Sequence, residues 1–303
     1  MDRRTALKGA AAMLATAAVR VPELEAARPS TGGPPAYDLS VPEQAMDALV
    51  KMRGDLTGAE VAWYWTGSIW SMVPGEGNRR LFDYDGFSAA RFEAVEDGYR
   101  MLNREVGVYR DLESGDILDR WPNPYLGREV QVLHRLNDHV NVELKIHGRF
   151  GIGAIPITVM GDDIWWRLDL FFFRPSPISR EEYPLNVQHD MYQGSELTMY
   201  HVRGSDLHDR SLTSAPAEVT FTRVSQWEPF MEMGNRPGQM VFHAAGKKLM
   251  GGAAELETLD PRLHHFISSG HSEYLHAPEE WQPGTISQWD AFKELQEAKT
   301  AGE

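Results

Sequence analysis

Alternating apolar and polar positions dominate the chain between about residue 60 and residue 243. Runs rich in β-branched and aromatic residues follow one another there, and turns containing glycine, aspartate or asparagine separate them. The runs are Glu60–Met72, Arg79–Phe92, Tyr99–Tyr109, Glu129–Leu136, Val140–Ile146, Ile164–Phe173, Leu197–Val202, Glu218–Val224 and Gln239–His243. Many strands at such short spacing predict antiparallel pairing.

Helical periodicity occurs only near the two ends of this region. A stripe of Ala45, Met46, Leu49 and Val50 follows Ser40-Val41-Pro42-Glu43, whose spacing is that of a capping box. A second stripe consists of Ile286, Trp289, Phe292, Leu295 and Gln296. We therefore predict a mainly β protein: a single antiparallel β-barrel of lipocalin-like or related topology, with flanking N- and C-terminal helices.

One predicted strand has two faces that both look covered. Along Ile164–Phe173, one face is purely apolar, and the other mixes charged and aromatic residues: Trp165, Arg167, Asp169, Phe171 and Phe173. This pattern indicates a barrel wall beneath a helix. Arg167 and Asp169 are then expected to need partners, because an unpaired buried charge is costly.

Composition and charge narrow the function classes. The chain has 303 residues, with 30 Lys and Arg against 44 Asp and Glu, and a formal net charge of −14. It contains no stripe of basic residues that could neutralise phosphates, which argues against nucleic-acid binding. It contains no cysteine, which excludes disulfides and thiolate metal sites. P-loop, Rossmann and nucleophile-elbow motifs are missing from the sequence, which argues against those enzyme classes.

The first residues resemble an export signal. Arg3-Arg4 precedes Leu7-Lys8 and an apolar run from Ala10 to Val19, the arrangement of a twin-arginine signal peptide. We expect residues 1–28 to be the signal peptide, residues 29–36 a linker and residues 37–303 one barrel domain. The mature chain is expected in the periplasm and not in the membrane, since the apolar run is shorter than a bilayer requires.

The densest polar region carries a family resemblance. Asp119-Arg120-Trp121-Pro122-Asn123-Pro124-Tyr125-Leu126-Gly127 and Asn137-Asp138-His139-Val140-Asn141 resemble the hallmarks of the bacterial "domain of unknown function 1838" family. The resemblance extends from about Tyr37 to Trp289, and the chain departs from the pattern at Leu126 and His139. It implies an all-β fold and no particular activity. The asparagines of these segments are either turn formers or polar groups at a barrel mouth.

Histidines on apolar strand faces are candidates for chemistry. His134, His189 and His201 occupy such positions by parity, and they are either metal ligands or core residues bonded to neighbours. We expect the second, and therefore neither a metal nor a cofactor. The many tryptophans and tyrosines are chiefly core residues, although a lumen lined with them would suit a hydrophobic small molecule.

Two functional hypotheses follow. In the first, the protein is a cofactor-free isomerase, cyclase or lyase: His134 or His201 is the general acid and base, and Asp138 or Asp169 orients it. Tyr64, Tyr192 and Asn137 would donate hydrogen bonds to a developing oxyanion. In the second, a periplasmic binding or carrier protein uses the same cavity without catalysis. The remaining expected ligand contacts are Trp65, Trp121, Asn123, Asn141, Trp165, Arg167 and His189. The C-terminal helix leaves either a monomer or a homodimer open.

Overall fold

The computed structural model describes residues 36–281 and 288–301. The expected signal peptide, residues 1–28, and all but the last residue of the expected linker lie outside the described residues. No helix of the described chain is long and apolar enough to cross a membrane.

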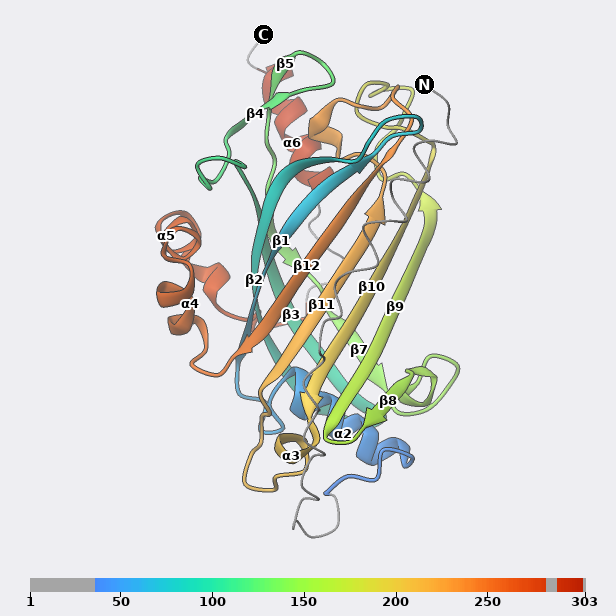
Figure 1. The fold of residues 1–303 in the computed structure, drawn as a ribbon, viewed down its shortest axis with the longest axis vertical. Helices are drawn as coiled ribbons and strands as arrows, with labels where there is room; N and C mark the ends of the chain where they lie inside the picture. Colours follow the sequence, from blue (N-terminus) through green and yellow to red (C-terminus); the bar gives the residue numbers. More distant parts are fainter. Residues whose placement is uncertain (1–35, 282–287, 302–303) are drawn as a thin grey trace, which may run out of the picture. The chain divides into compact units, whose positions relative to one another are not determined.

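One large antiparallel sheet organises the described residues (Figure 1). It contains ten strands in the order β6-β3-β2-β1-β12-β11-β10-β9-β8, with β7 also paired to β3. Their bounds are β1 (Val61–Met72), β2 (Arg79–Val95), β3 (Gly98–Arg110), β6 (Arg135–His139), β7 (Val142–Lys145), β8 (Ile157–Met160), β9 (Asp163–Pro175), β10 (Met191–Arg203), β11 (Ala217–Ser225) and β12 (Gln239–Leu249). Two further strands, β4 (Arg120–Asn123) and β5 (Arg128–Gln131), form a separate ribbon.

The prediction of a mainly β, antiparallel protein is confirmed. The strand order is an open path, and in the described part of the chain no pairing joins the β8–β9 end to the β6–β7 end. The run Glu129–Leu136, expected as one strand, is split between β5 and β6. Short helices complete the fold: α2 (Pro42–Arg53), α3 (Gly204–Leu207), α4 (Ala253–Leu259), α5 (Pro261–Gly270) and α6 (Gln288–Ala301), with 3-10 turns η1 (Ile152–Ala154), η2 (Pro229–Met231) and η3 (Ser272–Leu275).

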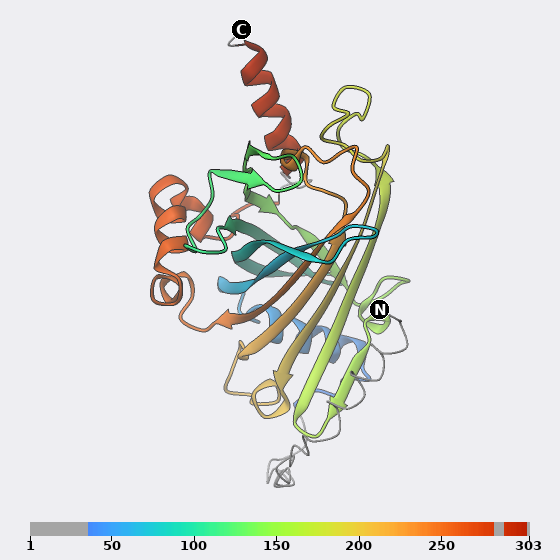
Figure 2. The ribbon, with the colours of Figure 1, turned by 45° about the horizontal axis from the view of Figure 1, so that its top comes forward.

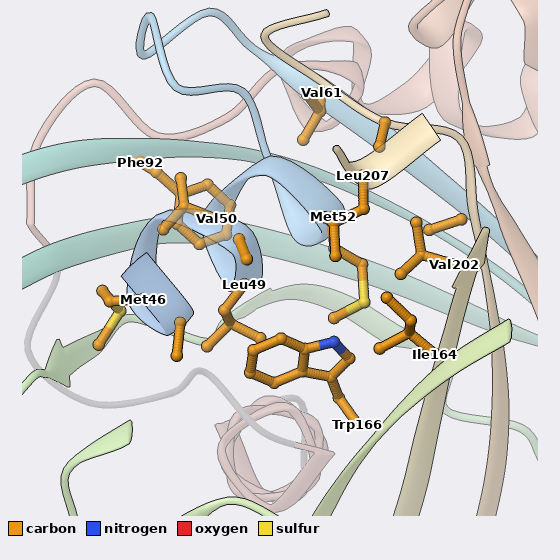
Figure 3. Close-up of a cluster of buried hydrophobic side chains, with 14 of the residues drawn as sticks. Met46, Leu49, Val50, Met52, Val61, Phe92, Ile164, Trp166, Val202 and Leu207 are labelled. Atoms are coloured by element: carbon orange, nitrogen blue, oxygen red, sulfur yellow. The ribbon is translucent and has the colours of Figure 1, made fainter. Parts of the chain in front are cut away.

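Helix α2 covers one end of the sheet's inner face (Figure 2). Its buried Leu49 and Met52 pack with Ile164, Trp166 and other residues of β9 and β10, and Trp166 is completely buried (Figure 3). The helical stripe read from the sequence is this packed face. The expected capping box is not formed: Val41 is the N-cap, and the Ser40 hydroxyl donates to Asp38 instead.

A lysine from the middle of the sheet closes the C-terminal end of α2. The buried Lys248 ammonium group on β12 donates to the carbonyl oxygens of Lys51, Met52, Gly54 and Ala215 at 2.6–3.2 Å. Three of these carbonyls belong to the last turn of α2 and its C-cap, where no helical N–H is left to bond them. The N-terminal helix is therefore tied to the last long strand.

Helices α4 and α5, which the sequence pattern did not reveal, pack on the outer face of β1, β2 and β3. A buried ion-pair network lies beneath them: Arg110 pairs with both Asp85 and Asp260. Asp260 is also the N-cap of α5, since its side chain accepts a hydrogen bond from the Leu263 N–H at 3.0 Å. Arg110 therefore anchors the junction between α4 and α5 to the sheet.

The outer face of β9 is not covered, contrary to the sequence prediction. Phe171 and Phe173 are 76% and 73% exposed, and Arg167 and Asp169 are exposed as well. The two charges therefore need no buried partner. Parity alone could not distinguish an apolar face covered by a helix from an apolar face left open to solvent.

Candidate functional site on the inner face

A cluster of charged and aromatic side chains lies on the inner face of the sheet, beyond the end that α2 covers. We call it the inner-face cluster. Its members come from β2, β3, β6, β10, β11 and β12, and from the segment before η2: Tyr84, Glu105, Tyr109, Arg135, Asp138, Tyr192, Glu196, Arg223, Glu228 and Phe242. Its residues face one another because alternate residues of each strand point to this side.

A bulge in β6 brings an arginine and an aspartate to the same face. Glu105 pairs with Asp138 and Gly107 pairs with Arg135, so three steps on β6 match two steps on β3. The extra residue is accommodated at Asn137, whose φ of 52° lies in the left-handed region. Asparagine tolerates this conformation better than most residues. Without the bulge, Arg135 and Asp138 would point to opposite faces.

The two arginines are held by the Phe242 ring, by the Tyr192 hydroxyl and by carboxylates. The guanidinium groups of Arg135 and Arg223 lie 5.8 and 5.6 Å from the centre of the Phe242 ring. Arg135 forms an ion pair with Glu228, whose side chain is almost fully buried. Arg223 donates to the Tyr192 hydroxyl at 2.5 Å and lies 3.5 Å from Glu196. Both cations are therefore fixed in orientation.

Negative charge exceeds positive charge in the cluster. The four acidic members Glu105, Asp138, Glu196 and Glu228 share the cluster with two basic members, Arg135 and Arg223. Burial, reinforced by the nearby carboxylates, raises the pKa of Glu105 to about 7. Burial also raises the pKa of Asp138 above its ordinary value, although both arginines oppose the shift.

Glu105 and Asp138 are neighbouring carboxyl groups, and burial raises the pKa of both. They are direct cross-strand neighbours, which places their Cβ atoms about 5 Å apart. The Asn103 amide donates to Glu105 at 3.0 Å, whereas the buried Oδ1 of Asp138 has no hydrogen-bond partner. Neither side chain is fully closed to solvent. A carboxyl group that titrates near neutrality and remains accessible suits general acid–base chemistry.

Two glycines let aromatic side chains lie close against the sheet beside this pair. Gly86 and Gly107 face each other across β2 and β3. A Cβ at Gly86 would come within 2.1 Å of the Trp65 ring, and one at Gly107 within 2.4 Å of the Tyr84 hydroxyl oxygen. The Tyr84 hydroxyl therefore lies over β3 at Gly107, two residues along the strand from Glu105. Burial raises the pKa of Tyr84 to about 12, so this hydroxyl stays protonated and can donate.

The inner face changes from polar to apolar at β9. Leu168, Leu170 and Phe172 alternate on this side, and Leu170, which pairs with Glu196, is half exposed. At the same side of the cluster, Trp289 of α6 packs edge-on against Tyr192 of β10 with 4.7 Å between ring centres. A ligand with an apolar body and a polar group would match this change of surface.

Some residues selected from the sequence belong to this site. Asp138 and Tyr192 are members of the cluster, Trp65 covers Gly86, and Asn137 forms the bulge. Asn141 accepts a hydrogen bond from the Asn103 N–H at 3.1 Å, which fixes the chain between β6 and β7.

The three selected histidines do not come together. His134 stacks on the Tyr109 ring, and its Nδ1 accepts a hydrogen bond from the Tyr109 backbone N–H at 3.3 Å. Burial lowers the pKa of His134 to about 4. Its ring is therefore neutral at physiological pH. His201 lies on the outer face of β10, stacked on Trp165 and 2.8 Å from Asp163. His189 lines a separate surface cavity.

The remaining selected residues lie away from the cluster. Tyr64 faces α5 and donates to Asp260 at 3.4 Å, while Arg167 and Asp169 are exposed on the outer face of β9. Trp121 packs on Phe82 in the core, and the buried Asn123 amide donates to the Met231 carbonyl at 2.8 Å. Asn123 also accepts from the Tyr125 N–H at 2.9 Å, as the turn interpretation of this segment requires.

Sequence reasoning missed Glu105, Arg135 and Arg223. The available signal was in β3, where Asn103 and Glu105 share a face with the buried Met101 and Tyr109. A polar pair in the middle of an otherwise buried face indicates a functional site or an internal ion pair. Among the described residues, no group of three or more His, Asp or Glu side chains is arranged to hold a metal ion.

The comparison with curated proteins found no match. The profile of one protein family, described as "Protein of unknown function (DUF1838)", matches residues 58–296. This range includes the whole sheet and every member of the inner-face cluster. The resemblance read from the polar segments is thereby confirmed, and the chain belongs to the DUF1838 family.

Proposed function

We propose that this protein is an enzyme that moves a proton on a small, largely apolar molecule bearing a carbonyl or hydroxyl group. The observation that carries the proposal is the Glu105 carboxyl group. Its pKa is about 7, it pairs with Asp138 on the neighbouring strand, and it belongs to a polar cluster that borders the apolar side chains of β9 at Glu196. A group with a pKa near the working pH is an efficient proton acceptor and donor.

In the proposed reaction, ionised Glu105 takes a proton from the carbon next to a ligand carbonyl. The C–H electron pair forms a new carbon–carbon double bond while the π pair of the carbonyl moves onto its oxygen, and the Tyr84 hydroxyl donates a hydrogen bond to the resulting enolate oxygen. Glu105 then returns the proton to the same or another carbon, which completes an exchange or an isomerisation without an oxidant. Burial, together with the nearby Asp138 carboxylate, keeps the pKa of Glu105 near neutrality.

Hydrogen–deuterium exchange tests the proposal directly. The protein is incubated in D₂O with 4-phenyl-2-butanone, a small apolar ketone, and deuterium at its α-carbons is measured by mass spectrometry. We expect catalysed exchange that Glu105→Gln lowers by at least about 100-fold. His201→Gln is the comparison variant, because His201 was the histidine candidate and lies on the opposite face. Loss of exchange in His201→Gln but not in Glu105→Gln would refute the assignment.

The alternative is a binding or carrier protein that uses the same surface without catalysis. It predicts that apolar ketones bind and that Glu105→Gln changes their affinity, whereas the exchange rate stays at the buffer rate. Measuring binding by native mass spectrometry alongside exchange separates the two functions.

We also propose that the curved sheet serves as a lipocalin-like barrel, with its inner face as the container for the ligand. Helix α2 at one end of that face supports this proposal. From the Arg3-Arg4 signal, we propose export by the twin-arginine route to the periplasm as a free monomer or homodimer, without nucleic-acid or membrane partners. Fractionation of the native host tests the location: protein retained in salt-washed membranes would contradict it.

A further inference from the structure

A surface cavity outside the inner-face cluster has its own chemical character. It has a volume of about 670 Å³ and lies between the chain after β1, the segment before β10, and the loop of residues 234–239 before β12. Its size is within the range of small-molecule sites.

The arginine and histidine side chains that line the cavity are not matched by acidic ones. Arg180, His189 and Arg236 contribute to its wall, and none of its lining residues is an aspartate or a glutamate. This is unusual for a chain with a net charge of −14. Arg236 is held in place by Glu76 and by the Tyr125 ring, 4.5 Å from its guanidinium carbon. Arg180 is exposed and has no hydrogen bond, ion pair or ring contact with any residue in the described part of the chain.

Hydrogen bonds from buried side chains hold the loop of residues 234–239 that lines the cavity. The buried Gln188 amide donates to the carbonyls of Arg236 and Gly238 at 3.1 and 3.0 Å. The Trp227 indole N–H donates to the same Arg236 carbonyl at 2.9 Å. Gly238 has a φ of 135°, and a Cβ there would come within 2.6 Å of the Trp227 ring. The shape of the cavity therefore exists before any ligand arrives, which lowers the cost of binding.

The rest of the wall is apolar. Met72, which is 44% exposed, lines the cavity together with Val73, Pro74 and Pro237. From this combination, we propose a second binding site that takes a small organic anion with an apolar body. The guanidinium of Arg180 would bind the anionic group, preferably a carboxylate that it can contact through two N–H groups, and Met72 and the prolines would contact the apolar body. This proposal is independent of proton transfer at Glu105.

Calorimetric titration of the full chain tests the site with four probes of equal chain length: octanoate, octyl phosphate, 1-octanol and octylamine. We expect octanoate to bind one-to-one and more tightly than the neutral and cationic probes. Arg180→Gln should weaken octanoate at least about tenfold, because a charge-assisted hydrogen bond is lost. Tighter binding of octyl phosphate, with the same dependence on Arg180, would assign the site to phosphate esters within the same class of organic anions.

Two control variants locate the binding. Arg210→Gln removes another exposed arginine outside the cavity lining and should leave the octanoate affinity unchanged. Glu105→Gln should also leave it unchanged, since the inner-face cluster is separate. The proposal is overturned if octanoate does not bind, if 1-octanol binds equally well, if Arg180→Gln has no effect, or if Glu105→Gln abolishes binding.

Discussion

Replacing Glu105 by glutamine should change how the stability of the protein depends on pH. The folded protein holds a proton on Glu105 up to about pH 7, whereas the unfolded chain releases it at about the ordinary value of 4.5. Because the folded-state pKa is the higher one, the favourable contribution is complete below pH 4.5 and is lost as the pH rises through 7. Glu105→Gln cannot lose a proton, so it should remove this part of the pH dependence.

The size of the effect follows from the pKa difference. A change from 4.5 to about 7 is about 2.5 pH units, and at about 1.4 kcal/mol per unit this corresponds to about 3.5 kcal/mol at most. Glu105 is partly open to solvent and is coupled to Asp138, whose own ionisation changes when Glu105 is replaced. We therefore expect Glu105→Gln to be about 1–2 kcal/mol more stable than the wild type at pH 8, and nearly equal to it at pH 5.

Urea unfolding followed by tryptophan fluorescence at pH 5, 6, 7 and 8 measures this difference. Subtracting the wild-type free energy of unfolding at each pH removes the contributions of the titrating groups that do not interact with Glu105. Glu257→Gln, at an exposed position on α4, is the matched control and should give a flat difference. Parallel curves for Glu105→Gln and the wild type, or a variant that is less stable at pH 8, would refute the reasoning about the cluster.

Three further predictions concern the framework, and each is measured by urea unfolding. Asn137→Gly should keep the β6 bulge, whereas Asn137→Val should lower the free energy of unfolding by about 1–3 kcal/mol because valine strongly disfavours a positive φ; equal effects would contradict the bulge. Arg110→Met should cost about 3–5 kcal/mol, since it leaves Asp85 and Asp260 buried without their cation; a cost below about 1 kcal/mol would mean that water replaces the arginine. Lys248→Met should cost about 1–3 kcal/mol and speed amide exchange in the last turn of α2, and unchanged exchange there would exclude the capping role.

The sequence pattern predicted the strands because their alternation is a local property. Arg79–Phe92 and Tyr99–Tyr109 correspond closely to β2 and β3. The start of β10 was missed, because Gln193 and Gly194 interrupt the β-forming run before Leu197. Helix α4 has only seven residues, too few for helical periodicity to stand out.

The candidate site was less accessible to sequence reasoning. Asp138 was identified because it belongs to a dense polar segment, but its partners come from distant strands. In the sequence, Glu105 looks like an ordinary charged residue of a strand. Arg223 lies on β11, far from the β3 residue Glu105 along the chain, so the sequence does not show that they share a cluster. The bulge at Asn137 also breaks the parity rule by which faces were assigned. Only the folded arrangement shows that four carboxylates face two arginines.

The capping of α2 by Lys248 has a consequence for the order in which the protein can fold. The ammonium group and the Lys51 carbonyl that it binds are 197 residues apart in the chain. During synthesis, helix α2 therefore lacks this cap until β12, the last strand of the described chain, has left the ribosome. A nucleus that depends on such distant contacts forms slowly, because a long loop must close first. The fold of the domain is therefore completed late in synthesis, as one unit and not element by element.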